Sequence, residues 1–296
     1  MGPDGEAAVQ ASQPSASLDW FTELASSRRL TPKGRKLAHY IAANPRYVAF
    51  AAAADVAERI AVNPATVVRL AQALGFSGWT EFQLHFRHRY LGTLLPADVL
   101  RAHADDGTVS ALKVSLERDL ENLQSALGTV DFDVAERIAV TIAEARKTIV
   151  VSSGSYAAVG EVFAHLATFM GYSVELESHG GPHLVARFAS LQPGDCVFAI
   201  SFWRLNKHVV GATQNATNRG IATVALVDSR FSPLARAAVL SLVVPSESGS
   251  FFQSMTAPLA VVYGLLARLR ELGGEQIERT IEDAQQLYGE LDVLYT

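Results

Sequence analysis

Cysteine is almost absent from this 296-residue sequence. The single cysteine, Cys196, excludes an internal disulfide, and because it lies in the apolar run Asp-Cys-Val-Phe-Ala-Ile-Ser we expect a buried structural thiol. The cysteines and histidines show no zinc-ligand spacing, and the glycine patterns of dinucleotide-binding and P-loop proteins do not occur. We therefore predict no metal site and no cofactor.

Long apolar runs are missing too. No run reaches the roughly 18 residues that cross a membrane, and residues 1–17 have neither the basic start nor the apolar core of a secretion signal. These 17 residues are rich in glycine, proline, serine and alanine, which predicts a disordered lead-in. With 49% hydrophobic residues the rest of the chain can bury two cores. The sequence therefore predicts a cytoplasmic protein of two domains, with no membrane partner.

Acidic residues outnumber basic ones, and the net charge of −5 taken alone opposes nucleic-acid binding. The charge is unevenly distributed, however. Residues 28–90 hold ten lysines and arginines against three acidic residues, a balance of +7 that leaves −12 for the remainder. A basic segment on an acidic chain is typical of a DNA-binding module. The alternative is that these cations only solvate helix faces.

The basic segment contains a helix-turn-helix pattern. Residues 55–60 predict a short helix, Val62-Asn63-Pro64 a tight break, and residues 64–74 a second helix that stops at Gly75. The second helix of such a unit is usually the one that enters the DNA major groove. A further helix is expected at residues 80–91, with Phe82 and Phe86 in the core and His85 among the polar surface residues.

The second helix of the pattern has one apolar face, formed by Val67, Leu70, Ala71 and Leu74, which we expect to be buried. Its other residues can meet DNA: the small Ala65 permits close approach, Thr66 can bond a phosphate, and Arg69 can contact guanine or a phosphate. The alternative is that Thr66 and Arg69 are ordinary surface residues. The predicted DNA-binding residues are Lys33, Arg35, Lys36, Asn63, Ala65, Thr66, Arg69 and Gln72.

Residues 30–83 resemble the N-terminal helix-turn-helix domain of the RpiR/MurR family of bacterial regulators. The resemblance lies in Leu-Thr-Pro at 30–32, in Ala61-Val62-Asn63-Pro64-Ala65-Thr66-Val67-Val68-Arg69, and in Leu74-Gly75-Phe76-Ser77-Gly78-Trp79, where Trp79 stands at a position that is often phenylalanine or tyrosine. The resemblance implies a bacterial regulator that binds a near-palindromic operator in double-stranded DNA as a homodimer or tetramer.

Strands and helices alternate from residue 147 onward. Apolar strands are expected at 148–151, 173–176, 196–200, 223–227 and 240–244, separated by helices. This order predicts an α/β domain with a five-stranded parallel sheet flanked by helices, next to an all-α N-terminal bundle. Before the sheet, residues 109–128 and 131–145 predict amphipathic helices that either pack on the domain or also transmit a signal or build a dimer.

Residues 130–270 resemble the SIS (sugar isomerase) domain, the usual partner of the RpiR-type head. The frame matches at Val-Ser-Ser-Gly-Ser after the first strand and at Asp-Cys-Val-Phe-Ala-Ile-Ser at the third. The loop after the third strand departs from the phosphosugar-binding pattern Ser-x-Ser-Gly-x-Thr, because Trp203, Arg204 and Asn206 replace its second serine, glycine and threonine. The resulting division is a lead-in (1–17), a helix-turn-helix domain (18–92), a linker and connecting helix (93–130), an SIS-like domain (131–274) and a C-terminal helix (275–296).

Ligands of parallel sheets bind beyond the carboxyl ends of the strands. The residues expected to bind an anionic small-molecule effector there are Ser153, Ser155, Ser201, Arg204, Asn206, Lys207, Ser229 and Glu247. Three possibilities stay open: an acidic metabolite, a phosphosugar, or no ligand. Arg204 could instead pair with Glu247 or Asp228 and leave room for a neutral ligand.

A regulator controlled by a metabolite is the function that the sequence favours. One alternative is a sugar-phosphate isomerase, for which Glu247 and His183 are the candidate bases. The replaced phosphate loop and the basic head both oppose catalysis, so we expect no enzyme activity. The other alternative is an SIS-like domain that serves only as a dimerisation scaffold.

Overall fold

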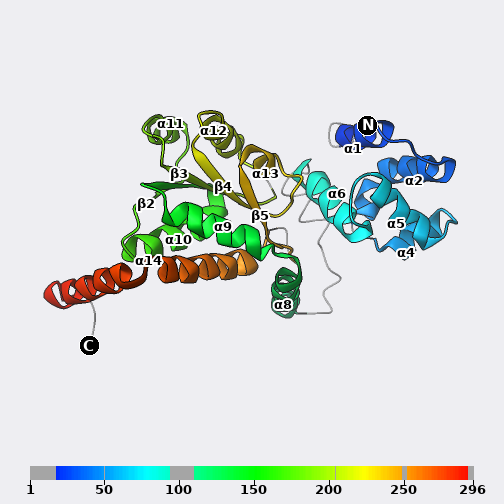
Figure 1. Cartoon of the computed structure of the whole chain (residues 1–296). Helices are drawn as coiled ribbons and strands as arrows, with labels where there is room; N and C mark the ends of the chain where they lie inside the picture. The colour runs from blue at the N-terminus through cyan, green and yellow to red at the C-terminus, as the bar shows by residue number, and fades with distance from the viewer. Residues whose placement is uncertain (1–17, 50, 94–109, 204, 249–251, 293–296) are drawn as a thin grey trace, which may run out of the picture. The chain divides into compact units, whose positions relative to one another are not determined.

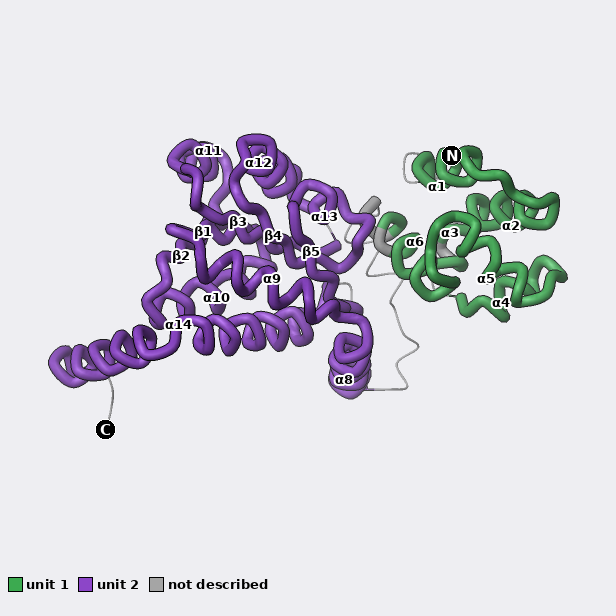
Figure 2. The backbone as a smooth tube through the Cα atoms, viewed as in Figure 1, with its two compact units in different colours: residues 1–104 green, residues 105–296 purple. Residues whose placement is uncertain are grey.

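The computed structural model describes residues 18–49, 51–93, 110–203, 205–248 and 252–292. The chain divides into two compact units, residues 1–104 and 105–296 (Figure 2). The predicted lead-in, much of the predicted linker, and Arg204 therefore lie outside the described residues. Among the described residues, no helix combines the length and the apolar character needed to cross a membrane.

The first unit is built of short helices (Figure 1). Two of their starts follow the predicted capping chemistry: Thr31 Oγ1 accepts a hydrogen bond from the backbone N–H of Gly34 (3.1 Å), and Asn63 Oδ1 accepts one from Ala65 (2.8 Å). Each cap is followed by a proline at the first helical position. The helices are α1 (Asp19–Ser26), α2 (Pro32–Ala43), α3 (Pro45–Val48), α4 (Ala53–Arg59), α5 (Pro64–Ala73) and α6 (Trp79–Thr93).

Aromatic side chains form much of the core of this unit. Phe21 on α1 packs edge-on against Phe86 on α6, with ring centroids 5.6 Å apart. Phe82 and Phe86 are buried as predicted. The placement of His85 on the polar surface is wrong: its side chain is 7% exposed and its ring lies edge-on to Trp20 at 5.0 Å. Helix α1 was not predicted from the sequence, and its Trp20 packs against this histidine.

The second unit contains a five-stranded, fully parallel sheet in the order β2-β1-β3-β4-β5. All five predicted strands are present within about two residues of their expected limits. The strands are β1 (Thr148–Val151), β2 (Val174–Glu177), β3 (Cys196–Ile200), β4 (Ala222–Val227) and β5 (Leu240–Val243). The helices are α8 (Ala111–Thr129), α9 (Phe132–Ala143), α10 (Ala157–Phe169), α11 (Gly181–Ala189), α12 (Lys207–Asn218), α13 (Pro233–Ala237) and α14 (Thr256–Glu290).

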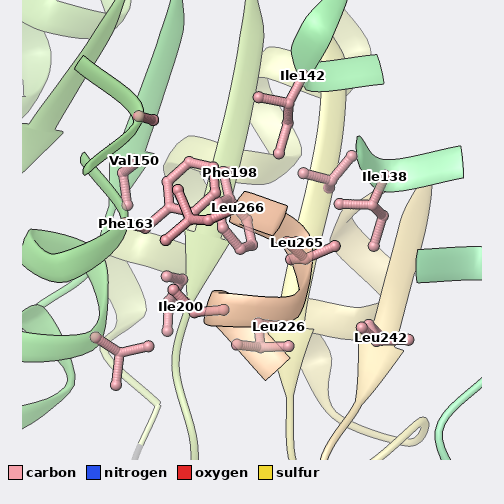
Figure 3. Packing of buried hydrophobic residues seen from close by; sticks show 14 of the residues in the cluster. Ile138, Ile142, Val150, Phe163, Phe198, Ile200, Leu226, Leu242, Leu265 and Leu266 are labelled. Atoms are coloured by element: carbon pink, nitrogen blue, oxygen red, sulfur yellow. The ribbon is translucent and has the colours of Figure 1, made fainter. Parts of the chain in front are cut away.

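Helices cover both faces of the sheet, as Figure 1 shows: α9, α10 and α14 lie on one side and α11, α12 and α13 on the other. Successive strand residues alternate between two cores because strand side chains point to opposite faces. In β3, Phe198 joins the core under α9, α10 and α14 (Figure 3), whereas Val197 and Ala199 join the core on the opposite side. Burial on both faces explains why the strands are continuously apolar.

The last helix, α14, runs from Thr256 to Glu290, with one interruption at Gly274 (φ 52°, ψ −138°). At the neighbouring Gly273, a Cβ atom would lie 2.3 Å from Ile277 Cδ1, so a larger residue would displace the buried Ile277. The two glycines divide α14 into an inner part that packs on the sheet and the predicted C-terminal helix.

Candidate functional site

The second helix of the helix-turn-helix, α5, presents the expected residues to solvent. Val67, Leu70 and Ala71 are buried, whereas Ala65, Arg69 and Gln72 are exposed and Thr66 is half-buried. Asn63 is exposed as well, but its side-chain oxygen is occupied by the helix cap. The structure therefore brings four of the predicted DNA-binding side chains onto one helix, with three of them open to a partner.

Helix α2 packs against α5 and adds positive charge beside it. The contact is close at Gly34, where a Cβ atom would lie 3.2 Å from Thr31 Oγ1 and 3.8 Å from Leu70 Cδ1. Lys33, Arg35 and Lys36 are exposed on α2, and Arg35 Nη1 donates to the carbonyl of Leu30 (2.8 Å). Within the described residues Lys33, Lys36 and Arg69 form no ion pair, so their charges are available to phosphates.

Three further arginines of the basic segment stabilise the fold of the unit. Arg59 lies over the ring of Tyr47, 3.7 Å from its centroid, and Arg89 lies over Trp20 at 4.8 Å. Arg87 Nε donates to the carbonyl of Ala49 (2.7 Å). The positive charge of the segment is thus divided between internal contacts and the exposed cations of α2 and α5.

The sheet has one topological switch point, between β1 and β3, because the chain leaves β1 toward β2 and then returns to the other side of β1. Ligands of open α/β sheets bind at such a point, outside the carboxyl ends of the strands. The two loops that meet there are residues 152–156 and 201–206. They are tied together by Ser152 Oγ, which donates to the carbonyl of Ile200 (3.0 Å).

The loop after β1 leaves backbone N–H groups open. It forms a 3-10 turn at Gly154–Tyr156 that leads into α10, and no side chain caps either helix start. Ser155 is exposed and Ser153 is half-buried. Gly154 has a φ of 62°, so the tight turn suits glycine. Uncapped N–H groups beside serine hydroxyls are a typical cradle for a phosphate or carboxylate.

The loop after β3 is more filled. Ser201 is buried and its hydroxyl has no hydrogen-bond partner within the described residues. Phe202 is fully buried against the edge of Tyr156, with centroids 5.5 Å apart. The backbone N–H of Trp203 donates to Asp228. Aromatic residues therefore narrow the space on this side of the switch point. Within the described residues, the buried hydroxyl of Ser201 has no hydrogen-bond partner.

The next helix, α12, differs from α10 because its start is capped. Asn206 Oδ1 accepts from the backbone N–H of His208 (2.8 Å), so the predicted ligand-binding amide already has a structural role. Lys207 is exposed in the first turn and supplies a positive charge near the switch point. Ser229 follows β4, where its Oγ accepts from the backbone N–H of Phe231 (3.2 Å).

Glu247 lies further away along the strand ends. It follows β5, three strand positions from β1, or about 14 Å at the usual strand spacing. His183, the other candidate base, is at the start of α11 beyond β2, on the opposite edge of the sheet. Four strand spacings, about 19 Å, separate those edges. The strand order therefore places the two candidate bases beyond opposite edges of the sheet.

The main chain of Glu247 anchors α8. The buried side chain of Asn122 donates to the Glu247 carbonyl (2.6 Å) and accepts from its N–H (3.2 Å). One turn earlier, Asp119 accepts from the hydroxyl of Thr256 (2.8 Å) and from that of Ser254. These contacts, which we call the α8 latch, connect the helix that follows the linker to the strand ends. Neither Asp119 nor Asn122 was singled out from the sequence, because nothing local marks their distant partners.

Cys196 is buried in β3, as predicted. Burial, with a contribution from Asp195, raises the pKa of its thiol to about 12. The reactive thiolate is therefore absent at neutral pH. The described structure thus gives this cysteine a packing role.

Comparison with known proteins assigns both units. The family model for the helix-turn-helix domain of the rpiR family matches residues 24–91, and the SIS domain model matches residues 141–268. The sugar isomerase domain of an RpiR transcription factor from Sphaerobacter thermophilus is 30% identical and has a TM-score of 0.57, covering 59% of this chain and 97% of that one. The chain belongs to the RpiR family of transcriptional regulators.

Two longer matches extend over both units of this RpiR-family chain. An uncharacterised HTH-type transcriptional regulator of Caldanaerobacter subterraneus subsp. tengcongensis is 25% identical over 271 residues, which is 90% of this chain and 94% of the relative. The structure of Vibrio vulnificus NanR complexed with ManNAc-6P is 23% identical, with a TM-score of 0.59, and covers 92% of this chain and 98% of NanR. The helix-turn-helix model matches within the first compact unit and the SIS model within the second.

Proposed function

We propose that this RpiR-family chain controls transcription from a near-palindromic operator as a homodimer, and that an anionic metabolite bound at the switch point alters its affinity for DNA. The observation that carries the proposal is the pairing of a cationic α5–α2 surface with a sheet whose loop after β1 leads into helix starts that no side chain caps. We propose that the genes it regulates form a catabolic operon. We also propose that the protein acts in the cytoplasm, where its DNA lies.

The DNA contact is proposed to centre on α5. Ala65 would let the helix approach the groove, Arg69 would contact a guanine edge or a phosphate, and Thr66 and Gln72 would flank it. Lys33, Arg35 and Lys36 would bind phosphates and set the orientation. Three phosphate contacts in each subunit of a dimer correspond to a slope of log K against log salt of about −5.

The effector is proposed to place its anionic group in the loop after β1, where Ser153 and Ser155 line uncapped N–H groups. The partnerless hydroxyl of Ser201 and the ammonium of Lys207 would hold it from the β3 side. Arg204 would add charge, and Ser229 would extend the polar wall. NanR was solved with the phosphosugar ManNAc-6P, which supports an acidic sugar derivative, although Phe202 and Trp203 leave less room here than a serine-rich loop would.

Dimerisation is proposed to use α8. Its exposed leucines, Leu112, Leu116 and Leu120, follow one another at four-residue spacing, and each is more than half exposed. Beside them lies an apolar groove of about 530 Å³ between α8, α9 and α14, lined by Leu127, Phe132, Val261 and their neighbours. Contiguous apolar surface of this kind marks an association site, and a second α8 fits its chemistry. A tetramer would need a further surface.

Catalysis is not part of the proposal. The two candidate bases, Glu247 and His183, lie at opposite edges of the sheet, as the strand order requires. We therefore expect no turnover of pentose or hexose phosphates in an isomerase assay.

Fluorescence anisotropy with labelled DNA from upstream of the gene tests the regulatory function. We expect sequence-selective binding that weakens steeply with salt. Equal affinity for the upstream fragment and for unrelated DNA at moderate salt would contradict it.

Thermal shift against sugar phosphates and acidic metabolites tests the effector site. A ligand at 100 times its Kd stabilises the folded chain by about 2.7 kcal/mol. Ser155→Ala and Ser201→Ala should reduce the shift. Ser190→Ala, beside Lys147 at the amino end of β1, is the matched control and should keep it. If both test variants showed the full thermal shift, the effector would have to bind at another site.

A further inference from the structure

One corner of the sheet gathers metal-binding side chains that neither the DNA surface nor the effector site uses. Glu177 ends β2, His179 follows in the loop, and His183 lies in the first turn of α11. One potential ligand atom from each of the three lies within 4.8 Å of the others. Glu177 Oε2 is 3.3 Å from His183 Nδ1, and the rings of His179 and His183 are 5.0 Å apart.

The loop geometry holds Glu177 in place. Its side chain is 1% exposed, and Oε1 accepts hydrogen bonds from the backbone N–H groups of His179 (3.0 Å) and Gly180 (2.9 Å). Gly180 has φ 71° and ψ −164°, a combination open essentially to glycine alone. Gly181 follows with a φ of 54°. This double-glycine turn folds the chain back so that the two histidines flank one buried carboxylate.

A third histidine lies near the loop, on α12. His208 Nδ1 is 3.9 Å from the position that a Cβ atom on Gly180 would take. Gly181 and His208 also line a groove of about 580 Å³ between α11 and α12, which gives an ion a route in from solvent.

We propose that Glu177, His179 and His183 bind a divalent transition-metal ion, with zinc as the best-suited ion. Two imidazole nitrogens and one carboxylate oxygen are a common zinc donor set, which leaves a fourth position for another ligand. The backbone N–H groups that bind Oε1 supply the supporting contacts by which metal-ligating carboxylates are oriented.

The proposed metal site is separate from the DNA surface and from the effector site of the proposed regulatory function. The corner lies at the outer edge of the sheet, on the far side of β1 from the β3 loop. It is connected to the switch point through Ser152, whose backbone N–H donates to the carbonyl of Glu177 (3.1 Å). A bound ion would fix the start of α11 relative to the end of β2. It revises the prediction of no metal site, because the pattern Glu-x-His-x3-His gains its meaning from the turn that separates the histidines.

The competing explanation is an ion pair. A protonated His183 would balance the carboxylate of Glu177 without a metal, and His179 would then have no role. Removing His179 separates the two explanations, since a ligand is lost in one case and an exposed surface residue in the other.

Isothermal titration of the full chain with ZnCl2, after removal of any histidine tag, tests the proposal. We expect one zinc per chain, together with the visible absorption of tetrahedral cobalt when Co²⁺ replaces zinc. His179→Ala and His183→Ala should each weaken binding by about 100-fold, the upper end of what the loss of a supporting contact costs at a metal site. His165→Ala removes an exposed histidine on α10 and should bind as the wild type does.

Two results would overturn the proposal. One is the absence of saturable zinc binding to the wild-type chain. The other is binding that His165→Ala weakens as much as His179→Ala does. Circular dichroism of each variant confirms that it folds, and DNA binding measured in parallel keeps this test independent of the regulatory proposal.

Discussion

The helical unit and the sheet unit leave different chemistry on their surfaces. The helical unit buries its aromatic residues and exposes cations on α2 and α5. The sheet unit buries two apolar cores and still leaves α8 with a row of exposed leucines. Exposed charge suits a polyanionic partner at long range, whereas exposed apolar area suits a second protein surface. This contrast supports the proposal that the helical unit binds DNA and that the sheet unit associates with a second copy and binds a small ligand.

The largest effect should come from the apolar row of the sheet unit. Replacing Leu116 and Leu120 with glutamate should yield monomers, because charges cannot be buried at the proposed interface. DNA affinity should then fall by about 10²–10⁴-fold, since two linked heads bind more tightly than one. Analytical ultracentrifugation and anisotropy measure both quantities. Val239→Glu, at another exposed apolar residue, is the control. A double variant that stays dimeric would place the interface elsewhere.

Arg69→Ala tests the DNA-binding surface of the helical unit. Losing one good base contact costs about 1–3 kcal/mol, so operator affinity should fall by roughly 5- to 150-fold, while the dimer persists. Arg270→Ala, an exposed arginine of the sheet unit, should bind the operator normally. Equal losses in the two variants would mean that only bulk charge matters.

Lys36→Ala should instead lower affinity for all DNA alike and reduce the slope of log K against log salt by about one.

The α8 latch gives an intermediate effect. Asn122→Ala removes both hydrogen bonds to the main chain of Glu247, which costs about 1–3 kcal/mol of stability. Chemical denaturation of the full chain measures the loss, and anisotropy with and without effector shows whether DNA binding still responds. Ser125→Ala, on the same helix, is the control. Full stability in Asn122→Ala would show that the remaining contacts of α8, among them those of Asp119 and Leu123, are sufficient to hold it.

The smallest effect concerns the turn of the helix-turn-helix. Ala61 has a φ of 53°, a conformation that costs a non-glycine residue about 1–2 kcal/mol. Ala61→Gly removes that strain but raises the freedom of the unfolded chain, which offsets about 0.4–1 kcal/mol. We expect a net stabilisation of at most about 1.6 kcal/mol, seen as a small rise in Tm. A lower Tm would show that the Ala61 methyl group makes favourable contacts.

Local chemistry explains which parts of the fold the sequence predicts. Asn63 and Pro64 mark the start of α5 because both act within one turn, and the strands are found because burial on both faces makes them continuously apolar. Helix α1 was not anticipated, and neither was the burial of His85 beneath its Trp20, because that contact joins residues 65 positions apart.

The functional residues divide in the same way. Ser153, Ser155 and Ser201 were placed by their positions after strands, and the strand order brings their loops together. The corner around Glu177 needed the conformation of Gly180, and the α8 latch needed the return of the chain after β5. The first depends on a backbone conformation and the second on a contact between residues 125 positions apart, so neither could be inferred before the structure.

The α8 latch has a consequence for how this regulator could diversify. Asn122 holds residue 247 by its peptide groups, so the identity of that side chain is irrelevant to the attachment. Any amino acid except proline, which lacks the N–H, would preserve both bonds. Chemical selectivity at the strand ends could therefore change by substitution at residue 247 while the attachment of α8 to the sheet unit stayed intact.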